Sequence, residues 1–313
     1  MKIAILMSTY NGEKYLTEQI KSLKAQTLKN WDLYIRDDGS TDKTLEIISN
    51  QVESDQRIHY VSDSEKRLRP MRSFFKLLNE ISADYYFFCD QDDFWLPNKL
   101  ELMMTEIGDK DNHIPQLLYC GLRCVDQNLK PLVNDFENLP GKINGKSRFI
   151  GNDMPGCVML LNKNLRDLII NYTKNYENII MHDWWIALVA EAFGNVSFLD
   201  KKLILYRQHG DNSIGAGVNG GVIKKIFKKN VLKKQKNLIR ITYFQTMQFY
   251  LSYKEILTSE YIRFLRDYMK CKDFNVIYRK HFLKKYNLGG STWLRFEAYK
   301  FLFIYKLPRL LEE

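Results

Sequence analysis

The chain has 313 residues, of which 45% are hydrophobic and 13% aromatic. This length suits one large domain, or one domain with an appendage, and the apolar content excludes a wholly disordered chain. The five cysteines form no CxxC pair, which argues against a zinc site or a disulfide framework and indicates buried thiols in a reducing compartment. The apolar run at residues 3–7 is too short for a signal peptide, and no run approaches the roughly 18 apolar residues that span a bilayer. We therefore expect a cytoplasmic protein.

The net charge of +10 is unevenly distributed along the chain. Residues 221–313 carry 21 Lys/Arg and 7 Asp/Glu, a net charge of +14, whereas the preceding residues have a net charge of −4. This asymmetry indicates that the acidic body and the basic tail have different tasks.

Strand and helix patterns alternate through the first ninety residues. Apolar β-rich runs predict strands at residues 2–8, 31–38, 58–63 and 84–90, with helical patterns at about 15–23, 41–55 and 71–82 between them. The last run, DYYFFCD, lacks polar alternation, as expected of a strand buried on both faces of a parallel sheet. The order predicts an α/β fold with a Rossmann-like, mostly parallel sheet flanked by helices.

The pattern is looser in the second half of the chain. We expect a strand at 117–126, a strand turning into a helix at 154–165, a loop entering an apolar helix at 179–194, and a strand pair at 196–210. Four glycines between residues 215 and 221 predict a flexible linker, after which the sequence is helical, basic and aromatic. The predicted division is a domain at 1–215, a linker at 216–222 and a helical extension at 223–313.

Polar clusters follow the predicted strands, at Ser8–Asn11, Asp37–Asp38 and Asp90–Asp93. Turns are rich in Asp and Asn in any protein, but repeated acidic pairs at one edge of a parallel sheet favour a ligand site. Carboxylates packed this closely repel one another unless a cation compensates them. A hard ion such as Mn²⁺ or Mg²⁺ suits them, since it takes oxygen ligands and shares them with substrate phosphates.

Two further clusters are candidates for chemistry. His182-Asp183-Trp184-Trp185 opens an apolar helix, where Asp183 is either a plain helix cap or a general base beside aromatic rings that stack on a sugar. Tyr206-Arg207-Gln208-His209 is either a surface turn or a site where Arg207 pairs with a phosphate and His209 binds the metal or phosphate.

These segments resemble the family 2 glycosyltransferases, the inverting group with the GT-A fold. The matching pieces occur in the family's order and cover residues 1–215: ILMSTYNG at 5–12, RDDGSTD at 36–42, FFCDQDDFWLPNKL at 87–100, MHDWW at 181–185 and YRQHGDN at 206–212. Within the family, the motifs are most similar to those of bacterial rhamnosyltransferases of cell-wall and capsule polysaccharide assembly.

The resemblance implies a role for each matched residue. Those implied to bind the nucleotide donor are Thr9, Tyr10, Asn11, Glu13, Asp38, Arg72, Asp92 and Arg207. Those implied to bind the metal are Asp92, Asp93 and His209, while Asp183 is the implied catalytic base and Trp184 and Trp185 line the acceptor.

One segment departs from the family pattern. Many relatives have Asn-x-Gly followed by a basic residue and Asn, whereas residues 65–75 are EKRLRPMRSFF, with no Gly and with Ser73 in place of the Asn. Arg72 keeps the basic position. Because glycine tolerates positive φ, we expect this loop to be reshaped near the donor.

The implied reaction is transfer of a sugar from a nucleotide diphosphate to a hydroxyl, with inversion in a single displacement. The implied donor is dTDP-rhamnose, with a UDP-hexose as the alternative, and the implied acceptor is a glycan or a lipid-linked glycan. A nucleotidyltransferase lacks support because STYNGEKY has no Gly-rich phosphate loop, and a catalytically inactive sugar-nucleotide-binding protein is the remaining alternative.

The basic tail has two interpretations. Its helices either pack on the body or lie on an anionic membrane with aromatic residues at the boundary, which places the protein at the inner face of the plasma membrane. Nucleic-acid binding is not expected, because the body has no nucleic-acid motif.

Overall fold

The structure is a computed structural model that describes residues 1–108, 113–132, 143, 145–208, 224–289 and 293–312, with residues 224–232 and 293–295 as backbone only. The Gly-rich segment and His209 therefore lie outside the described residues. Among the described helices, none is long and apolar enough to cross a bilayer.

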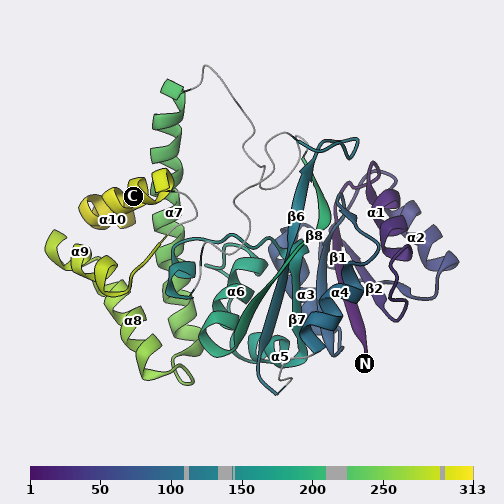
Figure 1. The fold of residues 1–313 in the computed structure, drawn as a ribbon, viewed down its shortest axis with the longest axis horizontal. Helices are drawn as coiled ribbons and strands as arrows, with labels where there is room; N and C mark the ends of the chain where they lie inside the picture. Colours follow the sequence, from purple (N-terminus) through teal and green to yellow (C-terminus); the bar gives the residue numbers. More distant parts are fainter. Residues whose placement is uncertain (109–112, 133–142, 144, 209–223, 290–292, 313) are drawn as a thin grey trace.

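An eight-stranded sheet in the order β3-β2-β1-β4-β7-β6-β8-β5 forms the centre of the body (Figure 1). Its strands are β1 (Ile3–Thr9), β2 (Asp32–Asp37), β3 (Ile58–Tyr60), β4 (Tyr85–Asp90), β5 (Phe94–Trp95), β6 (Gln116–Val125), β7 (Met159–Asn162) and β8 (Asn195–Arg207). Strands β3, β2, β1 and β4 are parallel, and β7 and β5 run against their neighbours. The predicted α/β fold with a mostly parallel sheet is confirmed.

Helices flank this sheet. They are α1 (Leu16–Lys24), α2 (Thr44–Ser54), α3 (Arg69–Glu80), α4 (Lys99–Gly108), α5 (Lys163–Tyr172) and α6 (His182–Phe193), with short 3₁₀ turns η1 (Gly145–Phe149) and η2 (Gly156–Val158). The strand β4 is buried along YYFFC, as its unbroken apolar sequence predicts. All five cysteines are buried, and none of them forms a disulfide with another described residue.

The predicted strand pair at 196–210 is wrong, because β8 is one continuous strand over Asn195–Arg207. Its pairing with β6 shifts in register next to Gly121, so that Asp200 and Lys201 bulge outward. The polar residues of the bulge resemble a turn in sequence, but the extra residues are absorbed within the strand.

The sheet register gathers the polar strand ends. Ser8 of β1 lies opposite both Arg36 of β2 and Asp90 of β4, and Thr9 lies opposite Asp37. Arg207 ends β8, which runs parallel to β6. Because carboxyl ends of parallel strands share an edge, the clusters predicted from separate motifs meet at one site.

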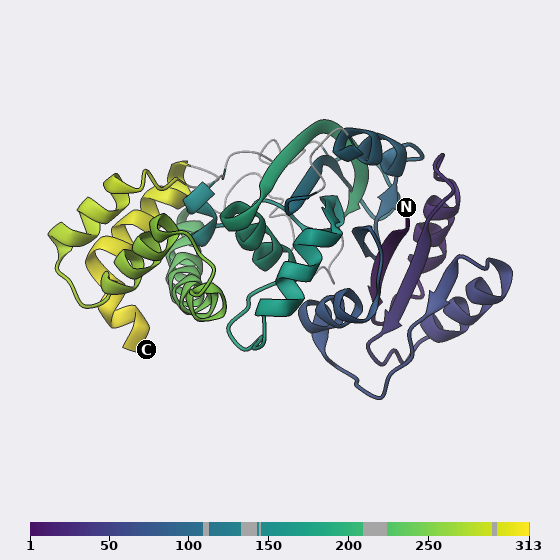
Figure 2. The same cartoon turned by 90° about the horizontal axis from the view of Figure 1, so that it is seen from below.

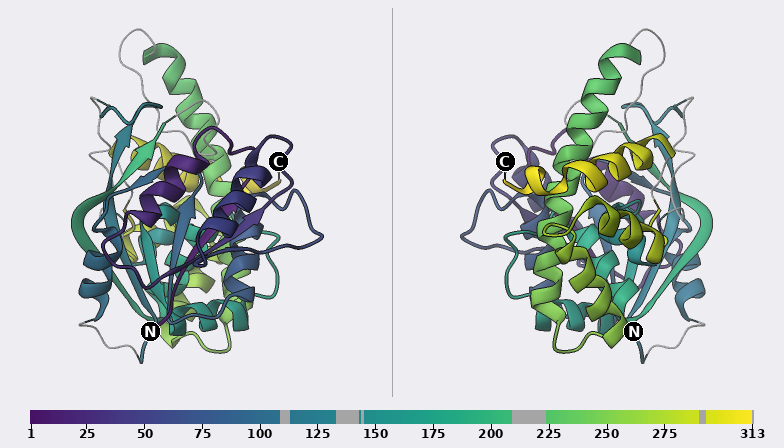
Figure 3. Two further views of the ribbon diagram at one scale, coloured as in Figure 1. Left: turned by 90° about the vertical axis from the view of Figure 1, so that its right-hand side faces the viewer. Right: turned by 90° about the vertical axis from the view of Figure 1, so that its left-hand side faces the viewer.

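The basic tail folds into α7 (Lys224–Tyr253), α8 (Ser259–Lys270), α9 (Val276–Lys285) and α10 (Trp293–Glu312). Figures 1 and 2 show this bundle at one end of the molecule, on the other side of α6 from β1–β3, and Figure 3 shows α10 crossing α7.

The tail packs on the body through aromatic contacts. Phe249 of α7 is fully buried, with its ring centroid 5.5 Å from that of Trp185 in α6. The Tyr253 hydroxyl lies 2.9 Å from the Thr173 hydroxyl, and the Gly289 N–H donates to Ser147 at 2.9 Å. The packing interpretation of the tail therefore holds for its inner face.

Candidate active site

The turn after β1 is bound to the start of α2. The buried Thr9 hydroxyl donates to the Asp37 carboxylate at 2.9 Å, and that carboxylate also accepts the backbone N–H of Ser40 at 2.8 Å. Asn11 and Glu13 accept the backbone N–H groups of Thr41 and Lys43, respectively. Thr9, Asn11 and Glu13 thus shape the turn after β1 through bonds to their own chain.

Tyr10 is the exposed member of this turn, with 50% of its surface accessible. Its backbone N–H donates to Gln91 Oε1 at 2.9 Å, and its carbonyl accepts from Gln91 Nε2 at 3.0 Å. A Cβ on Gly12 would lie 2.4 Å from Gln91 Oε1, so any other residue there would displace the Gln91 side chain from these hydrogen bonds. Gln91, which the sequence interpretation left without a role, joins the β1 turn to the acidic motif.

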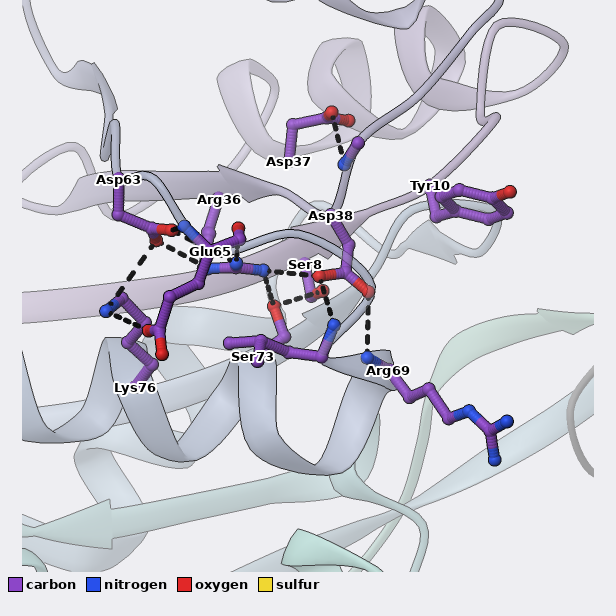
Figure 4. Close-up of polar contacts among 12 residues, drawn as sticks. Ser8, Tyr10, Arg36, Asp37, Asp38, Asp63, Glu65, Arg69, Ser73 and Lys76 are labelled. Atoms are coloured by element: carbon purple, nitrogen blue, oxygen red, sulfur yellow. Dashed lines mark hydrogen bonds and ion pairs between the residues drawn. The ribbon is translucent and has the colours of Figure 1, made fainter.

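Asp38 lies in a buried polar network (Figure 4). Its carboxylate accepts Arg36 Nη1, the Leu68 N–H and the Arg69 N–H, each at 2.8 Å, and only 5% of the residue is exposed. Arg36 is fully buried and also binds Asp63 at 2.7 Å. In this structure Asp38 holds the loop before α3, and the donor-binding role expected of it is not evident in its contacts.

The acidic motif forms a turn after β4. Asp93 is fully buried, whereas Asp90 is only partly buried. Burial, with the neighbouring charges of Asp92 and Asp183, raises the pKa of Asp90 to about 7. Burial and the charges of Asp92 and Asp90 also raise the pKa of Asp93 well above its usual range. The carboxylates therefore lie in an environment that favours a compensating cation.

The residues present fit a divalent cation. Oδ2 of Asp93 is buried and has no hydrogen-bond partner among the described residues. Asp90, Asp93 and Cys157 each offer one atom within 4.8 Å of the others. Hard cations such as Mn²⁺ and Mg²⁺ prefer oxygen ligands to sulfur, so the carboxylates of Asp90 and Asp93 are the fitting donors.

This set differs from the predicted ligands Asp92, Asp93 and His209. Asp93 is common to both sets, and Asp90 was missed although it lies in the same motif. Asp92 is outside the cluster, and His209 lies beyond the described residues.

Arg207 does not present a guanidinium to a phosphate, contrary to expectation. It is 1% exposed, and its donors reach the Asp92 carbonyl at 2.7 Å and the carboxylate of Glu18 at 2.5 Å. Its backbone N–H donates to Asp93 Oδ1 at 3.1 Å. The side chain donates its hydrogen bonds to groups within the protein. Arg207 therefore positions the acidic turn.

Asp183 lies in the first turn of α6, next to the acidic motif. It is 7% exposed, and burial raises its pKa to about 7, although the N–H groups of Trp184 and Gly156 oppose that shift. A carboxylate with a pKa near neutrality is suited to accept a proton. Gly156 is required beside it, since a Cβ there would lie 2.6 Å from Nε2 of His182.

His182 is buried against Phe74 and Phe88, with ring centroids 4.3 and 5.1 Å away. Burial lowers its pKa to about 3, so the ring is neutral.

The predicted acceptor platform of two tryptophans is wrong for Trp185. That ring is fully buried between the body and α7, and its Nε1 donates to Thr173 at 2.9 Å. Trp184 is 7% exposed, and its Nε1 donates to the Arg148 carbonyl. Trp185 is buried because Phe249 and Tyr253 of α7 cover that side of α6.

Lys99 is a site residue that sequence reasoning missed. It is fully buried at the start of α4, its Nζ donates to the Cys157 carbonyl at 2.8 Å, and it lies 3.0 Å from the Trp95 ring centroid. Burial lowers its pKa to about 8, and its charge lowers the pKa of Asp90. The only sequence signal was a lysine just after the acidic motif.

Comparisons with known proteins agree with this architecture. The family model described as Glycosyl transferase family 2 matches residues 4–159. The chain is 29% identical, over 72% of its length and 82% of the relative's, to the dTDP-rhamnosyl transferase RfbG of Shigella flexneri.

Two solved structures share the fold across 99% of this chain. TarS 1–349 of S. aureus in complex with UDP has a TM-score of 0.58 at 14% identity, with 89% of that chain covered. The mannosyltransferase PcManGT of Pyrobaculum calidifontis in complex with GDP-Man and Mn²⁺ has a TM-score of 0.53 at 13% identity, with 84% covered. With the family match spanning the β1 turn and the acidic motif, the chain belongs to glycosyl transferase family 2 and is a glycosyltransferase.

Proposed function

We propose that the protein transfers a sugar from a nucleotide diphosphate donor to a hydroxyl group of a glycan or lipid-linked acceptor, with inversion at the anomeric carbon. The observation that carries this proposal is the buried Asp183, whose pKa is raised to about 7 beside the acidic turn. Asp183, which can accept a proton, thus lies next to carboxylates that suit a divalent metal ion, and such an ion binds diphosphate.

Each residue has a distinct task in this reaction. Asp183 takes the proton from the attacking hydroxyl, and the Gly156 N–H holds its carboxylate in place. Asp90 and Asp93 would hold a divalent cation, which when bound neutralises charge on the leaving diphosphate. Tyr10 and Arg72 are exposed and contact the donor nucleotide. One base and a direct displacement suffice for inversion, as in inverting glycosidases.

We propose dTDP-rhamnose as the donor and bacterial surface polysaccharide synthesis as the setting, on the strength of the similarity to the Shigella rhamnosyl transferase. A UDP-hexose is the second candidate, supported by the fold shared with the UDP complex of TarS. A binding protein without activity is the outcome if no donor is turned over.

We also propose that residues 1–215 form the catalytic domain and that the extension at 223–313, beyond a linker at 216–222, meets the inner face of the plasma membrane. The support is the tail's net charge of +14 together with aromatic side chains on its outer face. Phe301 and Tyr305 of α10 are 52% and 46% exposed, and Lys280 of α9 lies over the Tyr305 ring. Such a surface suits anionic lipid.

The test of the catalytic role is Asp183→Asn, which keeps the shape of the side chain and removes the base. We expect turnover to fall roughly 10²–10⁴-fold while dTDP or UDP binding, measured by calorimetry, is unchanged. Asp200→Asn, the same change at an exposed position of β8, is the matched control. Turnover of Asp183→Asn close to that of the control would disprove the assignment.

A further inference from the structure

Two arginines between β3 and the start of α3 adopt a backbone conformation that favours glycine: Arg67 in the loop and Arg69 as the first residue of α3. Arg67 has φ of 60° and Arg69 has φ of 64°. Side chains with a Cβ are strained there, and Arg69 is further restricted because Pro70 follows it. Positive φ values therefore occur in the segment that lacks the family's glycine, and arginines adopt them.

Hydrogen bonds to Asp38 fix the backbone conformation of residues 67–69. Its carboxylate accepts the Leu68 and Arg69 N–H groups at 2.8 Å, and its carbonyl accepts the Arg67 N–H at 3.1 Å. Arg36, fully buried, holds Asp38 in turn. These backbone donors are occupied, so the loop offers its side chains to a ligand and not its amides.

The two arginine side chains are exposed, and among the described residues neither forms an ion pair. The nearby acids have other partners: Asp63 pairs with Arg36 at 2.7 Å, and Glu65 pairs with Lys76 at 2.6 Å. In Figure 4 the Arg69 side chain extends away from this network, on the same side of the view as the Tyr10 ring. The strained loop thus presents two uncompensated cations at the carboxyl edge of the sheet.

We propose that Arg67 and Arg69 bind a phosphate group of a substrate at this edge, either the diphosphate of the donor or a phosphate of the acceptor. The inference rests on the proposed function, since it takes the substrates from that reaction. A guanidinium presents a planar fork that matches two phosphate oxygens. Strained residues persist where the surrounding structure fixes them and cluster at functional sites. The buried network around Asp38 supplies that support.

The variants Arg69→Gly and Arg67→Asn place residues that favour positive φ at the same positions. We expect both to leave the melting temperature unchanged or raised, because the strain is relieved, and to weaken phosphate binding about 10–100-fold, the scale of losing charged hydrogen bonds. Arg263→Ala, at an exposed position in α8, is the control.

Calorimetric titrations identify the source of the phosphate. If it is the donor's, the variants lose affinity for dTDP and UDP but not for thymidine and uridine. If it is the acceptor's, nucleotide binding is unchanged, and inorganic phosphate binds to nucleotide-saturated wild-type protein but not to the variants. Either result supports the proposal, and wild-type affinities in every titration overturn it. These titrations need no turnover, so they are independent of whether sugar transfer is detected.

Discussion

The backbone N–H of Arg207 donates to Oδ1 of Asp93 at 3.1 Å, joining the last residue of β8 to the acidic turn after β4. The Arg207 guanidinium adds bonds to the Asp92 carbonyl and to Glu18 of α1. Segments more than a hundred residues apart are thereby fixed around one carboxylate. A motif expected to touch substrate instead holds the acidic turn in place.

Arg207→Lys should therefore impair the site without removing a positive charge. A lysine cannot reproduce the separate guanidinium contacts to the Asp92 carbonyl, the Gln127 carbonyl and Glu18. We therefore expect about 2 kcal/mol of lost stability in urea unfolding, on the scale of hydrogen bonds to charged groups, together with lower turnover. Arg263→Lys, in an exposed position, is the control. If Arg207→Lys has the stability of the wild-type protein but binds nucleotide more weakly, Arg207 contacts a phosphate group.

Asp93→Asn should weaken metal binding, because it removes the charge of a buried carboxylate whose Oδ2 lacks a hydrogen-bond partner among the described atoms. Ligands that bind the folded state raise its melting temperature. We expect Mn²⁺ with dTDP or UDP to raise the wild-type melting temperature more than that of the variant, and EDTA to abolish wild-type turnover. Turnover that persists after complete chelation would contradict the metal role.

The pH dependence of turnover should report Asp183. Its raised pKa of about 7 means that the carboxyl is protonated, and inactive as a base, below that pH. At saturating donor and Mn²⁺, which would keep Asp90 in its charged form, we expect kcat to fall about tenfold per unit as the pH drops below 7, and to level off above it. Melting temperatures measured over the same pH range distinguish protonation of Asp183 from unfolding of the protein. A flat profile between pH 5 and 8 would exclude Asp183 as the base.

Lys99→Met should reduce turnover without reducing stability. Methionine fills a similar volume, and replacing a buried charge by an apolar side chain is often neutral or stabilising. The Cys157 carbonyl loses its donor, so the η2 turn beside Asp183 loosens, and we expect turnover to fall about 10–100-fold. Lys99→Arg should recover part of the activity. A large loss of stability in Lys99→Met with no effect on kcat would make Lys99 purely structural.

Phe249→Ala should destabilise the whole protein, because the ring is buried against Trp185. Loss of a buried Phe costs about 3–5 kcal/mol. Leu251→Ala, in the same helix but 55% exposed, should change stability by less than about 0.5 kcal/mol. Equal effects in urea unfolding would indicate that α7 does not pack on α6.

The sequence by itself determined the order of the strands and helices in the first ninety residues, since apolar runs such as YYFFC and the periodic helices between them depend on local patterns. It also determined that the polar strand ends share an edge, because parallel strands leave no other arrangement. The acidic motif was found in this way, whereas Asp183 was found as an acidic residue at the start of an apolar helix.

Only the tertiary structure decided which polar groups face a ligand and which face the protein. Arg207 and Trp185 occupy motifs that match substrate-binding segments, yet both are buried by elements distant in sequence, Glu18 of α1 and Phe249 of α7. Lys99 and Cys157 join the acidic turn through contacts that no local pattern encodes. The partners of a side chain depend on packing between segments that are distant in sequence. Its hydrogen bonds and its pKa are therefore determined only by the tertiary structure.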